Sequence, residues 1–371
     1  MQQVLFSWLV VGELGAAPEV MGAVALTNTL PVLLLLLAAG VLADRLERRR
    51  LLTLLHLGWA LAAGALAAAV SLGMLSLPVV FAYAAVSGAL MAFVIPTRDA
   101  MLTDVVRGDL MRAVTAVTLA QFGGQATGSL VAGSARFLEL GPTIALQAAL
   151  MAAAAGVLAT LPRSQGTGAR RLDAREIMGG LAEVAASPTM RATMMLMTGV
   201  GLFLSGAYFV VLPIMVRDHY QGDVAQLAIF MTTLQIGTVA GAATLLVARR
   251  LPRRGPALAA ALGCSALPLL VLSLGISFAA ALCAAFFWGL CVAAFNSIGR
   301  GLMQEAAPAA HRARVLSVFS LAVMGAGVLS APLAGGLAGA FGPLGALGLA
   351  GGAMLVFVVG VGFATRIGRI A

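Results

Sequence analysis

The densest group of ionisable side chains in this sequence lies at residues 40–50, which read GVLADRLERRR. The stretch combines two acids with four arginines: Asp44, Glu47, Arg45, Arg48, Arg49 and Arg50. Carboxylates and guanidinium groups at this spacing offer ion pairing. The sequence has no phosphate-cradling loop, metal-ligand cluster or catalytic triad beside it. We therefore expect neither an enzyme nor a bound cofactor or metal.

Two long apolar runs flank this stretch, one beginning near Val20 and the other covering residues 51–73. Each is long enough to cross a bilayer, because about 20 helical residues cover the hydrocarbon core. The turn between them is short and basic, which is typical of a cytoplasmic loop. The charged residues thus lie where one spanning helix ends and the next begins.

The composition indicates a polytopic membrane protein. The 371 residues are 61% hydrophobic and 10% charged, whereas soluble domains carry about 25% charged residues. All 23 basic residues are arginines, and they collect in alternate loops; only Arg136 and Arg217 fall on the predicted outer side. The net charge of +9 therefore follows from topology and implies no nucleic-acid partner. Cys264, Cys283 and Cys291 lie in apolar runs and are interpreted as packing residues.

The apolar runs predict the spanning helices. Residues 1–11 are too short to span, whereas eleven later segments have the required length. These lie near 20–43, 51–72, 78–97, 112–136, 142–161, 189–216, 224–248, 255–276, 278–300, 312–338 and 343–365. A polar linker at 162–188 carries arginines and is expected in the cytoplasm, partly as an amphipathic surface helix.

An internal repeat relates the two halves of the chain. A shift of 201 residues places Gly40 on Gly241, Asp104 on Glu305 and Gly124 on Gly325. We therefore expect one six-helix bundle at 1–161 and a second at 189–371. The same shift would start the first helix before Met1, so its first half is expected to be missing from this chain.

The stretch at 40–50 resembles the signature loop of the major facilitator superfamily, Gly-x-Leu-Ala-Asp-Arg-x-Gly-Arg-Arg. The residues that fit are Gly40, Leu42, Ala43, Asp44, Arg45, Arg48 and Arg49, while Glu47 takes the place of the second glycine. The resemblance implies an all-α fold of two six-helix bundles in parallel pseudo-repeat. It also implies that Asp44 and Arg45 hold an outward-facing state without touching substrate, the acid acting on a helix N-terminus.

Two further acids occupy equivalent places after the third and ninth of the predicted spanning segments. Asp104 and Glu305 are expected to pair with nearby arginines across an inner gate. The candidate partners are Arg98, Arg112, Arg300 and Arg314. The alternative is a set of solvated interfacial pairs that contribute about 0–1 kcal/mol each.

Glycines in two segments favour close helix packing. Gly124 and Gly128 form a GxxxG spacing, and Gly325, Pro332 and Gly335 repeat the theme in the second half. The pattern resembles the antiporter motif of drug exporters, although Ser129 stands where that motif has proline.

Polar side chains inside the apolar runs are the candidate substrate contacts, because such groups usually face the bundle interior. Interhelical hydrogen bonding is the alternative for each of them. The candidates are Asn28, Thr118, Gln121, Gln125, Ser205, Tyr208, Gln235, Trp288 and Asn296. His56 is interpreted as structural, and no acid lies at mid-membrane depth.

The proline placement and compact loops resemble the branch that holds the enterobactin exporter and macrolide efflux proteins. That resemblance implies a monomeric exporter of the bacterial inner membrane, with a cytoplasmic C-terminus. The substrate would be an amphipathic drug or siderophore exchanged for protons by alternating access. Two alternatives stay open, a sugar or metabolite permease and a facilitator-like protein that does not transport.

Overall fold

The computed structural model describes residues 1–105, 110–162, 174–247, 253–308 and 311–365. These residues form helices joined by short turns, and no strand occurs among them. The chain folds into two compact units. The first comprises Met1–Ala16, Val24–Leu172 and Asp223–Ala228, and the second Ala17–Ala23, Asp173–Gly222 and Ile229–Ala371.

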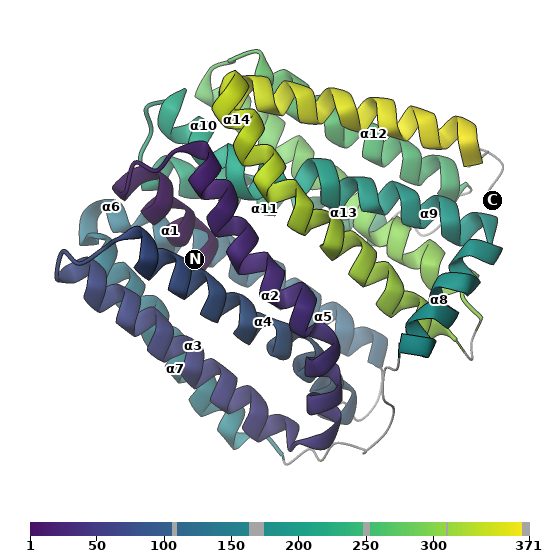
Figure 1. Cartoon of the computed structure of the whole chain (residues 1–371), viewed down its shortest axis with the longest axis horizontal. Coiled ribbons are helices and arrows are strands. Elements are labelled where there is room, and N and C mark those ends of the chain that lie inside the picture. The colour runs from purple at the N-terminus through teal and green to yellow at the C-terminus, as the bar shows by residue number, and fades with distance from the viewer. Residues whose placement is uncertain (106–109, 163–173, 248–252, 309–310, 366–371) are drawn as a thin grey trace. The chain divides into compact units, whose positions relative to one another are not determined.

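The helices of the first half follow one another with short turns, and α3 and α7 lie side by side (Figure 1). They are α1 (Gln2–Trp8), the π-helix η1 (Leu9–Glu13), α2 (Pro18–Arg45), α3 (Arg48–Ser71), α4 (Leu77–Val105), α5 (Leu110–Gly133), α6 (Ala135–Leu138) and α7 (Leu140–Thr160).

The second half repeats this order after a short linker helix. Its elements are the linker helix α8 (Ala174–Ala186), α9 (Pro188–Gly199), η2 (Val200–Leu204), η3 (Ala207–Val211), α10 (Leu212–Asp218), α11 (Val224–Val247), α12 (Arg254–Ser273), α13 (Phe278–Ala306) and α14 (Arg312–Thr365). The elements from α9 to α10 form one continuous span, Pro188–Asp218. The stretch α14 holds two helices that meet at Gly342.

Nine helices in the described part of the chain are long and apolar enough to cross a membrane. Many of their large apolar side chains are exposed, such as Leu61 (76%) and Val356 (75%). Exposed leucine and valine along a spanning helix fit contact with lipid. The polytopic all-α architecture predicted from the apolar runs is therefore confirmed.

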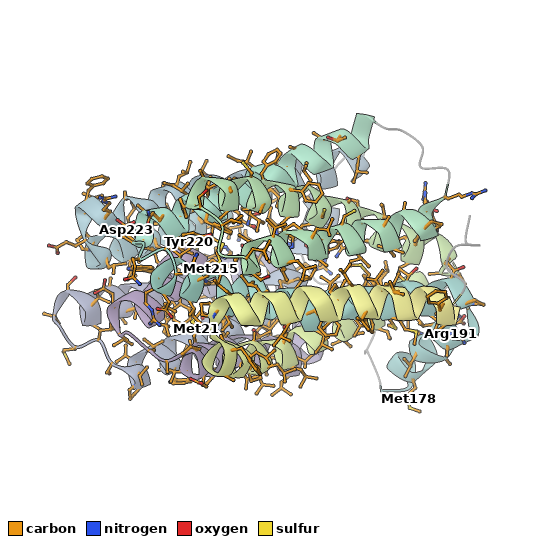
Figure 2. All side chains as sticks on the ribbon, turned by 90° about the horizontal axis from the view of Figure 1, so that it is seen from above. Met21, Met178, Arg191, Met215, Tyr220 and Asp223 are labelled. Carbon is orange, nitrogen blue, oxygen red and sulfur yellow. The ribbon has the colours of Figure 1, made fainter. Side chains whose placement is uncertain are left out.

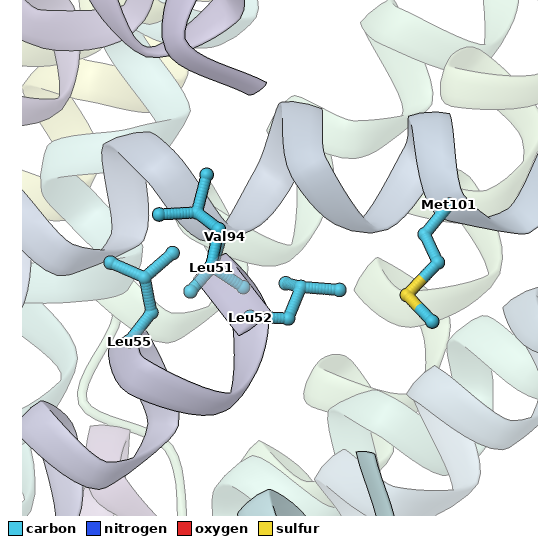
Figure 3. Close-up of a cluster of buried hydrophobic side chains, with 5 residues drawn as sticks. All are labelled: Leu51, Leu52, Leu55, Val94 and Met101. Carbon is cyan, nitrogen blue, oxygen red and sulfur yellow. The ribbon is translucent and has the colours of Figure 1, made fainter. Parts of the chain in front are cut away.

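The core between α3 and α4 begins directly after the arginines of α3. Leu51, Leu52 and Leu55 project from the first turns of α3 against Val94 and Met101 of α4 (Figure 3). These leucines recur at helical spacing, so they cover one face of α3. The charged start of α3 is thereby anchored to a packed helix pair.

The pseudo-repeat is visible in the helix starts and in one shared crossing. Helices α2 and α3 begin 206 residues before α11 and α12, whereas α4 begins 201 residues before α13. The single shift of 201 expected from the sequence therefore holds for α4 only, because the second half is longer ahead of α13. A Cβ on Gly88 would strike the backbone of Asn28, and one on Gly289 the backbone of Leu234. The two halves thus share the same close crossing.

The turn between α10 and α11 is fixed by one tyrosine. The Tyr220 hydroxyl donates a hydrogen bond of 2.9 Å to the carbonyl of Ile276, and its ring meets Phe278 edge-on at 5.3 Å. Burial raises the pKa of the Tyr220 phenol because water no longer solvates the phenolate. The neutral hydroxyl therefore keeps its proton for the carbonyl (labelled in Figure 2).

An unusual backbone conformation joins the last two helices of each half. Gly342 has φ 72° and ψ 169°, and Glu139, just before α7, has φ 64° and ψ 164°. This region is populated almost exclusively by glycine and costs other residues about 1–3 kcal/mol. The first half thus carries at Glu139 a strain that glycine removes in the second.

We predict that Glu139→Gly stabilises the protein. Relief of strain of about 1–3 kcal/mol, less the entropy cost of glycine of about 0.5–1 kcal/mol, leaves a net gain near ~1 kcal/mol. Thermal unfolding in detergent measures it. The matched change Gly342→Ala should lower the midpoint, and a lowered midpoint for Glu139→Gly would contradict the assignment.

Candidate functional site

Three polar or aromatic side chains meet inside the second unit. The Nε2 atom of Gln235 on α11 lies 3.4 Å from the hydroxyl oxygen of Tyr208 on η3. The ring of Trp288 on α13 meets the Tyr208 ring edge-on, with centroids 6.4 Å apart. Trp288 is only 2% exposed. Tyr208, Gln235 and Trp288 are called the Tyr–Gln–Trp cluster below.

The Tyr–Gln–Trp cluster lies near the middle of its helices. Tyr208 precedes the end of its span at Asp218 by ten residues, and Trp288 follows the start of α13 at Phe278 by ten. Gln235 follows the start of α11 at Val224 by eleven. A rise of 1.5 Å per residue puts all three about 15 Å from the helix ends. This is half of the hydrocarbon thickness of about 30 Å.

The helix that carries Tyr208 is interrupted by two π-helical stretches, Val200–Leu204 and Ala207–Val211. A π-helical turn displaces the regular backbone ladder, and such turns often mark functional sites. Between the two stretches, the Gly206 N–H donates to the Ser330 hydroxyl of α14 at 2.7 Å. A serine on a neighbouring helix therefore supports the irregular segment that presents Tyr208.

Glycine allows α14 to approach this segment closely. A Cβ at Gly206 would lie 2.6 Å from the Cβ of Ala334, and one at Gly201 would lie 2.9 Å from the Cβ of Ala326. Both distances are shorter than real carbon contacts, so larger residues would push the helices apart. The position of Tyr208 thus depends on its two neighbouring glycines.

A second glycine crossing places Gln235 beside Trp288. A Cβ on Gly289 would strike the carbonyl of Leu234, and one on Gly237 would strike the carbonyl of Phe286. The backbones of α11 and α13 therefore touch at the level of the Tyr–Gln–Trp cluster. This contact fixes the two side chains on adjacent helices at one depth.

The corresponding depth of the first unit holds a self-contained polar pair. The Asn28 amide of α2 donates to the Ser87 hydroxyl at 2.8 Å and to the Ala84 carbonyl of α4 at 3.1 Å. Each of Asn28 and Ser87 lies ten residues into its helix. The geometry favours the packing interpretation of Asn28 over substrate contact.

The remaining predicted lining residues do not join the Tyr–Gln–Trp cluster. Ser205 is half-buried towards Gly327 of α14, and the Asn296 amide donates to Val292 of its own helix while the side chain is exposed. Gln121 and Gln125 are exposed on α5. Thr118 lies outside the residues whose side chains the structure describes.

A buried polar pair in the first unit was missed by the sequence analysis. Gln147 of α7 is 3% exposed, and its Nε2 atom lies 3.4 Å from the Tyr83 hydroxyl of α4. Phe6 of α1 packs on the Tyr83 ring at 5.3 Å. The signal was present, because Gln147 is an isolated amide within an apolar run. His56 donates or accepts at 2.8 Å only with Leu52 of its own helix among printed bonds, as a structural histidine would.

The arginines at the start of α3 contact the ends of other helices. Arg48 is 5% exposed and donates to the Ala100 carbonyl of α4 at 3.4 Å. Arg49 donates to Leu161 at 3.2 Å, just past the end of α7, where a cation complements the helix dipole. Glu47 pairs with Arg49 at 3.2 Å and with Arg50 at 2.8 Å. The residue that departs from the signature pattern thus organises the arginines.

Several predicted gating residues lie outside the described side chains: Gly40, Asp44, Arg45, Asp104 and Arg112. Of the described ones, Glu305 pairs with Arg254 at the start of α12, so the predicted partners Arg300 and Arg314 are wrong. The sequence shift of 201 hid this pair, because α12 begins 206 residues after α3. Arg98 pairs with its neighbour Asp99 at 3.0 Å.

The linker helix α8 is fastened to the start of α14. His311 Nδ1 lies 2.7 Å from the Glu183 carboxylate of α8, and a Cβ at Gly180 would lie 3.2 Å from the Arg314 side chain. Met178 on another face of α8 is 70% exposed (Figure 2). Arg314 thus packs against the linker helix.

The predicted packing glycines behave differently from one another. A Cβ at Gly124 would meet nothing within 4 Å, so no helix packs closely there, whereas one at Gly128 would lie 2.8 Å from the Met1 nitrogen. In the second unit, a Cβ at Gly335 would lie 3.0 Å from Gly22, and Pro332 lies beside the same crossing. Gly325 lies half-buried on α14.

The described residues contain no group of three metal-ligating side chains. A model of the Major Facilitator Superfamily matches residues 1–322 of the chain. No curated protein matches the sequence.

Solved transporters share the fold. The nucleoside transporter NupG aligns with a TM-score of 0.75 at 15% identity, covering 100% of this chain and 97% of that one. A variant of the peptide transporter POT gives 0.75 at 16% identity, covering 99% and 92%. A bacterial homolog of the human lysosomal transporter Spinster, inward-facing and unoccupied, gives 0.69 at 15%, covering 98% and 93%. At such identity the likeness concerns the fold alone.

We predict that Ser330→Ala destabilises the protein by about 1–3 kcal/mol, because the Gly206 N–H loses its acceptor in a buried place. Ser265→Ala is the control: Ser265 is equally buried, but its hydroxyl only bonds back to Leu262 of its own helix. Thermal unfolding of both variants in detergent compares them. Equal losses would contradict the role of Ser330.

Arg48 and Arg254 both begin a helix, but their burial differs. Arg48→Gln should cost about 1.5–3 kcal/mol, the value of a buried hydrogen bond from a charged group. Arg254→Gln should cost less than about 1 kcal/mol, because Arg254 is 40% exposed and solvent screens its pair with Glu305. Denaturation midpoints measure both, and the reverse order would contradict the assignment.

Proposed function

The chain belongs to the Major Facilitator Superfamily, and from this membership we propose that it exports an amphipathic small molecule by alternating access. Membership makes it a multi-pass membrane transporter in contact with lipid. The finer proposal concerns direction, substrate and driving force. Its closest chemical resemblance is to exporters of drugs or siderophores, which we propose as the substrate class.

The observation that carries the proposal is the Tyr–Gln–Trp cluster. It sets an amide, a phenol and an indole at mid-depth on three different spanning helices. Transporters of this architecture bind their substrates near the bilayer midplane. Aromatic rings with polar edges suit a ligand that is partly apolar and partly polar. We propose that Tyr208, Gln235 and Trp288 contact the substrate.

The arginine-rich helix ends supply the proposed gate. Positive loops face the cytoplasm, so we assign the ends that carry Arg48 and Arg254 to that side, together with the C-terminus. Gating is proposed for Asp44, Arg45 and Asp104 along with the pair Arg254–Glu305. Ion pairs near the surface are individually weak, so they can break and re-form during a transport cycle.

The proposed organisation is two bundles, 1–161 and 189–371, joined by the linker 162–188, in a monomer of the bacterial inner membrane. We propose proton exchange as the driving force, by resemblance to drug exporters. The sequence places no acid at mid-depth. Proton exchange is therefore assigned to carboxylates near the helix ends, such as Asp44 and Glu305.

Efflux from proteoliposomes with an imposed pH gradient tests the proposal. Across a panel of fluorescent amphipathic drugs and a siderophore, we expect gradient-driven export. Gln235→Leu should slow it by about tenfold, since one lost hydrogen bond is worth near 1.4 kcal/mol. Asn296→Leu is the matched control and should change it by less than about twofold, because this amide bonds within its own helix.

Each other outcome points to a different function. Uptake in place of export would favour a permease, and export that ignores the pH gradient would remove proton exchange. Loss of transport in Asn296→Leu but not in Gln235→Leu would move the substrate site away from the Tyr–Gln–Trp cluster. Silence across the panel would favour a facilitator-like protein that does not transport.

A further inference from the structure

We propose that the Tyr–Gln–Trp cluster selects uncharged substrates, which offer a hydrogen-bond acceptor oxygen to the indole N–H of Trp288. This inference rests on the proposed function and specifies its substrate class. Four observations support it: unpartnered buried donors, the one-way chemistry of indole, the missing counter-ions and the surrounding rings.

Two buried polar atoms close to the cluster lack partners. Among the described residues, Trp288 Nε1 and Thr232 Oγ1 have no hydrogen-bond partner, although the residues are 2% and 4% exposed. Thr232 precedes Gln235 by three residues on α11, so the two lie on one helix face. Buried polar groups are nearly always paired, and an unpaired one calls for an explanation such as a ligand.

The chemistry of the indole defines what it can bind. An indole N–H is a donor only, so its partner must carry an acceptor. A carbonyl, ether or phosphoryl oxygen meets this need. The Thr232 hydroxyl can donate or accept, and it can therefore serve a second polar group of the same ligand.

The sequence offers no counter-ion at this depth. Between Arg191 and Arg217 the helix of Tyr208 holds no ionisable acid or base, and neither does α11 between Asp223 and its end at Val247. The helix α13 is likewise free of charge from Phe278 to Asn296. A charged ligand would lose its hydration here without a compensating partner, which is costly at low dielectric. An uncharged ligand avoids this cost.

The rings around the cluster indicate the shape of the ligand. Tyr208 meets Phe209 edge-on at 4.8 Å and Trp288 edge-on at 6.4 Å. Such rings favour offset or edge contacts with other aromatic groups. Because Trp288 is buried, the ligand reaches it when the transport cycle opens the site. The ligand class is thus an uncharged aromatic molecule with an acceptor oxygen.

Two probes of matched size separate charge from ring content. Triphenylphosphine oxide is uncharged and carries a strong phosphoryl acceptor, whereas tetraphenylphosphonium carries similar rings, a fixed positive charge and no acceptor. Calorimetry on the purified full chain in detergent measures both. We expect the oxide to bind at least about tenfold more tightly, the ratio that one good hydrogen bond provides.

Trp288→Phe keeps a ring and removes the N–H, and it should weaken oxide binding by about tenfold. Trp59→Phe is the matched control, because the Trp59 indole nitrogen is also buried without a partner but lies on α3; it should leave oxide binding within about twofold. Thr232→Val, nearly identical in shape, provides a second variant if Trp288→Phe does not fold.

Equal or tighter binding of tetraphenylphosphonium would overturn the inference. So would unchanged oxide binding in both Trp288→Phe and Thr232→Val, the result expected if bridging water satisfies these groups. The same preparations are reconstituted for transport of the drug and siderophore panel. Transport of panel compounds without oxide binding would reject the substrate class alone, whereas absence of both would reject the proposed function too.

Discussion

The hydrocarbon core of the membrane imposes one constraint on this protein: a polar group inside it must find its partner within the chain. Water is absent there, so an unpaired N–H or hydroxyl is expensive. The structure meets the constraint in several ways. Backbone groups pair within helices, Asn28 bonds Ser87 and Ala84, and Ser330 receives the N–H of Gly206 at an irregular turn. The places where the constraint is not met then become informative.

The two halves of the chain meet this constraint differently at the same depth. Both use a glycine crossing, Gly88 against Asn28 in the first half and Gly289 against Leu234 in the second. In the first half, the polar pair beside the crossing satisfies itself. In the second, the indole of Trp288 has no partner among the described side chains. A shared scaffold thus holds a closed polar contact in one half and an open donor in the other.

Much of the fold was predictable because apolar length is a strong signal. Runs of about 20 apolar residues leave few alternatives to a spanning helix, and arginine placement gives their orientation. The break at Gly342 was also legible, since Gly-Pro ends one helix and begins another. The equivalent conformation at Glu139 was not, because a glutamate does not signal a positive φ.

The candidate site was harder to predict, because side-chain contacts between helices leave little trace in a single sequence. Tyr208, Gln235 and Trp288 stood out as polar or aromatic groups in apolar runs, but equal signals came from Asn296, which faces away. The pair Arg254–Glu305 was missed because the repeat changes its offset between neighbouring helices. The π-helical turns around Tyr208 depend on support from Ser330, 122 residues later, which local propensity cannot reveal.

The central claim is that the middle of the second bundle binds an uncharged aromatic ligand. Photo-crosslinking tests it most directly, because benzophenone is itself uncharged, aromatic and a carbonyl acceptor. The reconstituted protein is irradiated with benzophenone, and the adducts are mapped by mass spectrometry. The account predicts adducts concentrated near Tyr208, Met231 and Trp288, and lost when triphenylphosphine oxide is in excess. Adducts spread over the exposed lipid-facing leucines, and unchanged by the oxide, would contradict it.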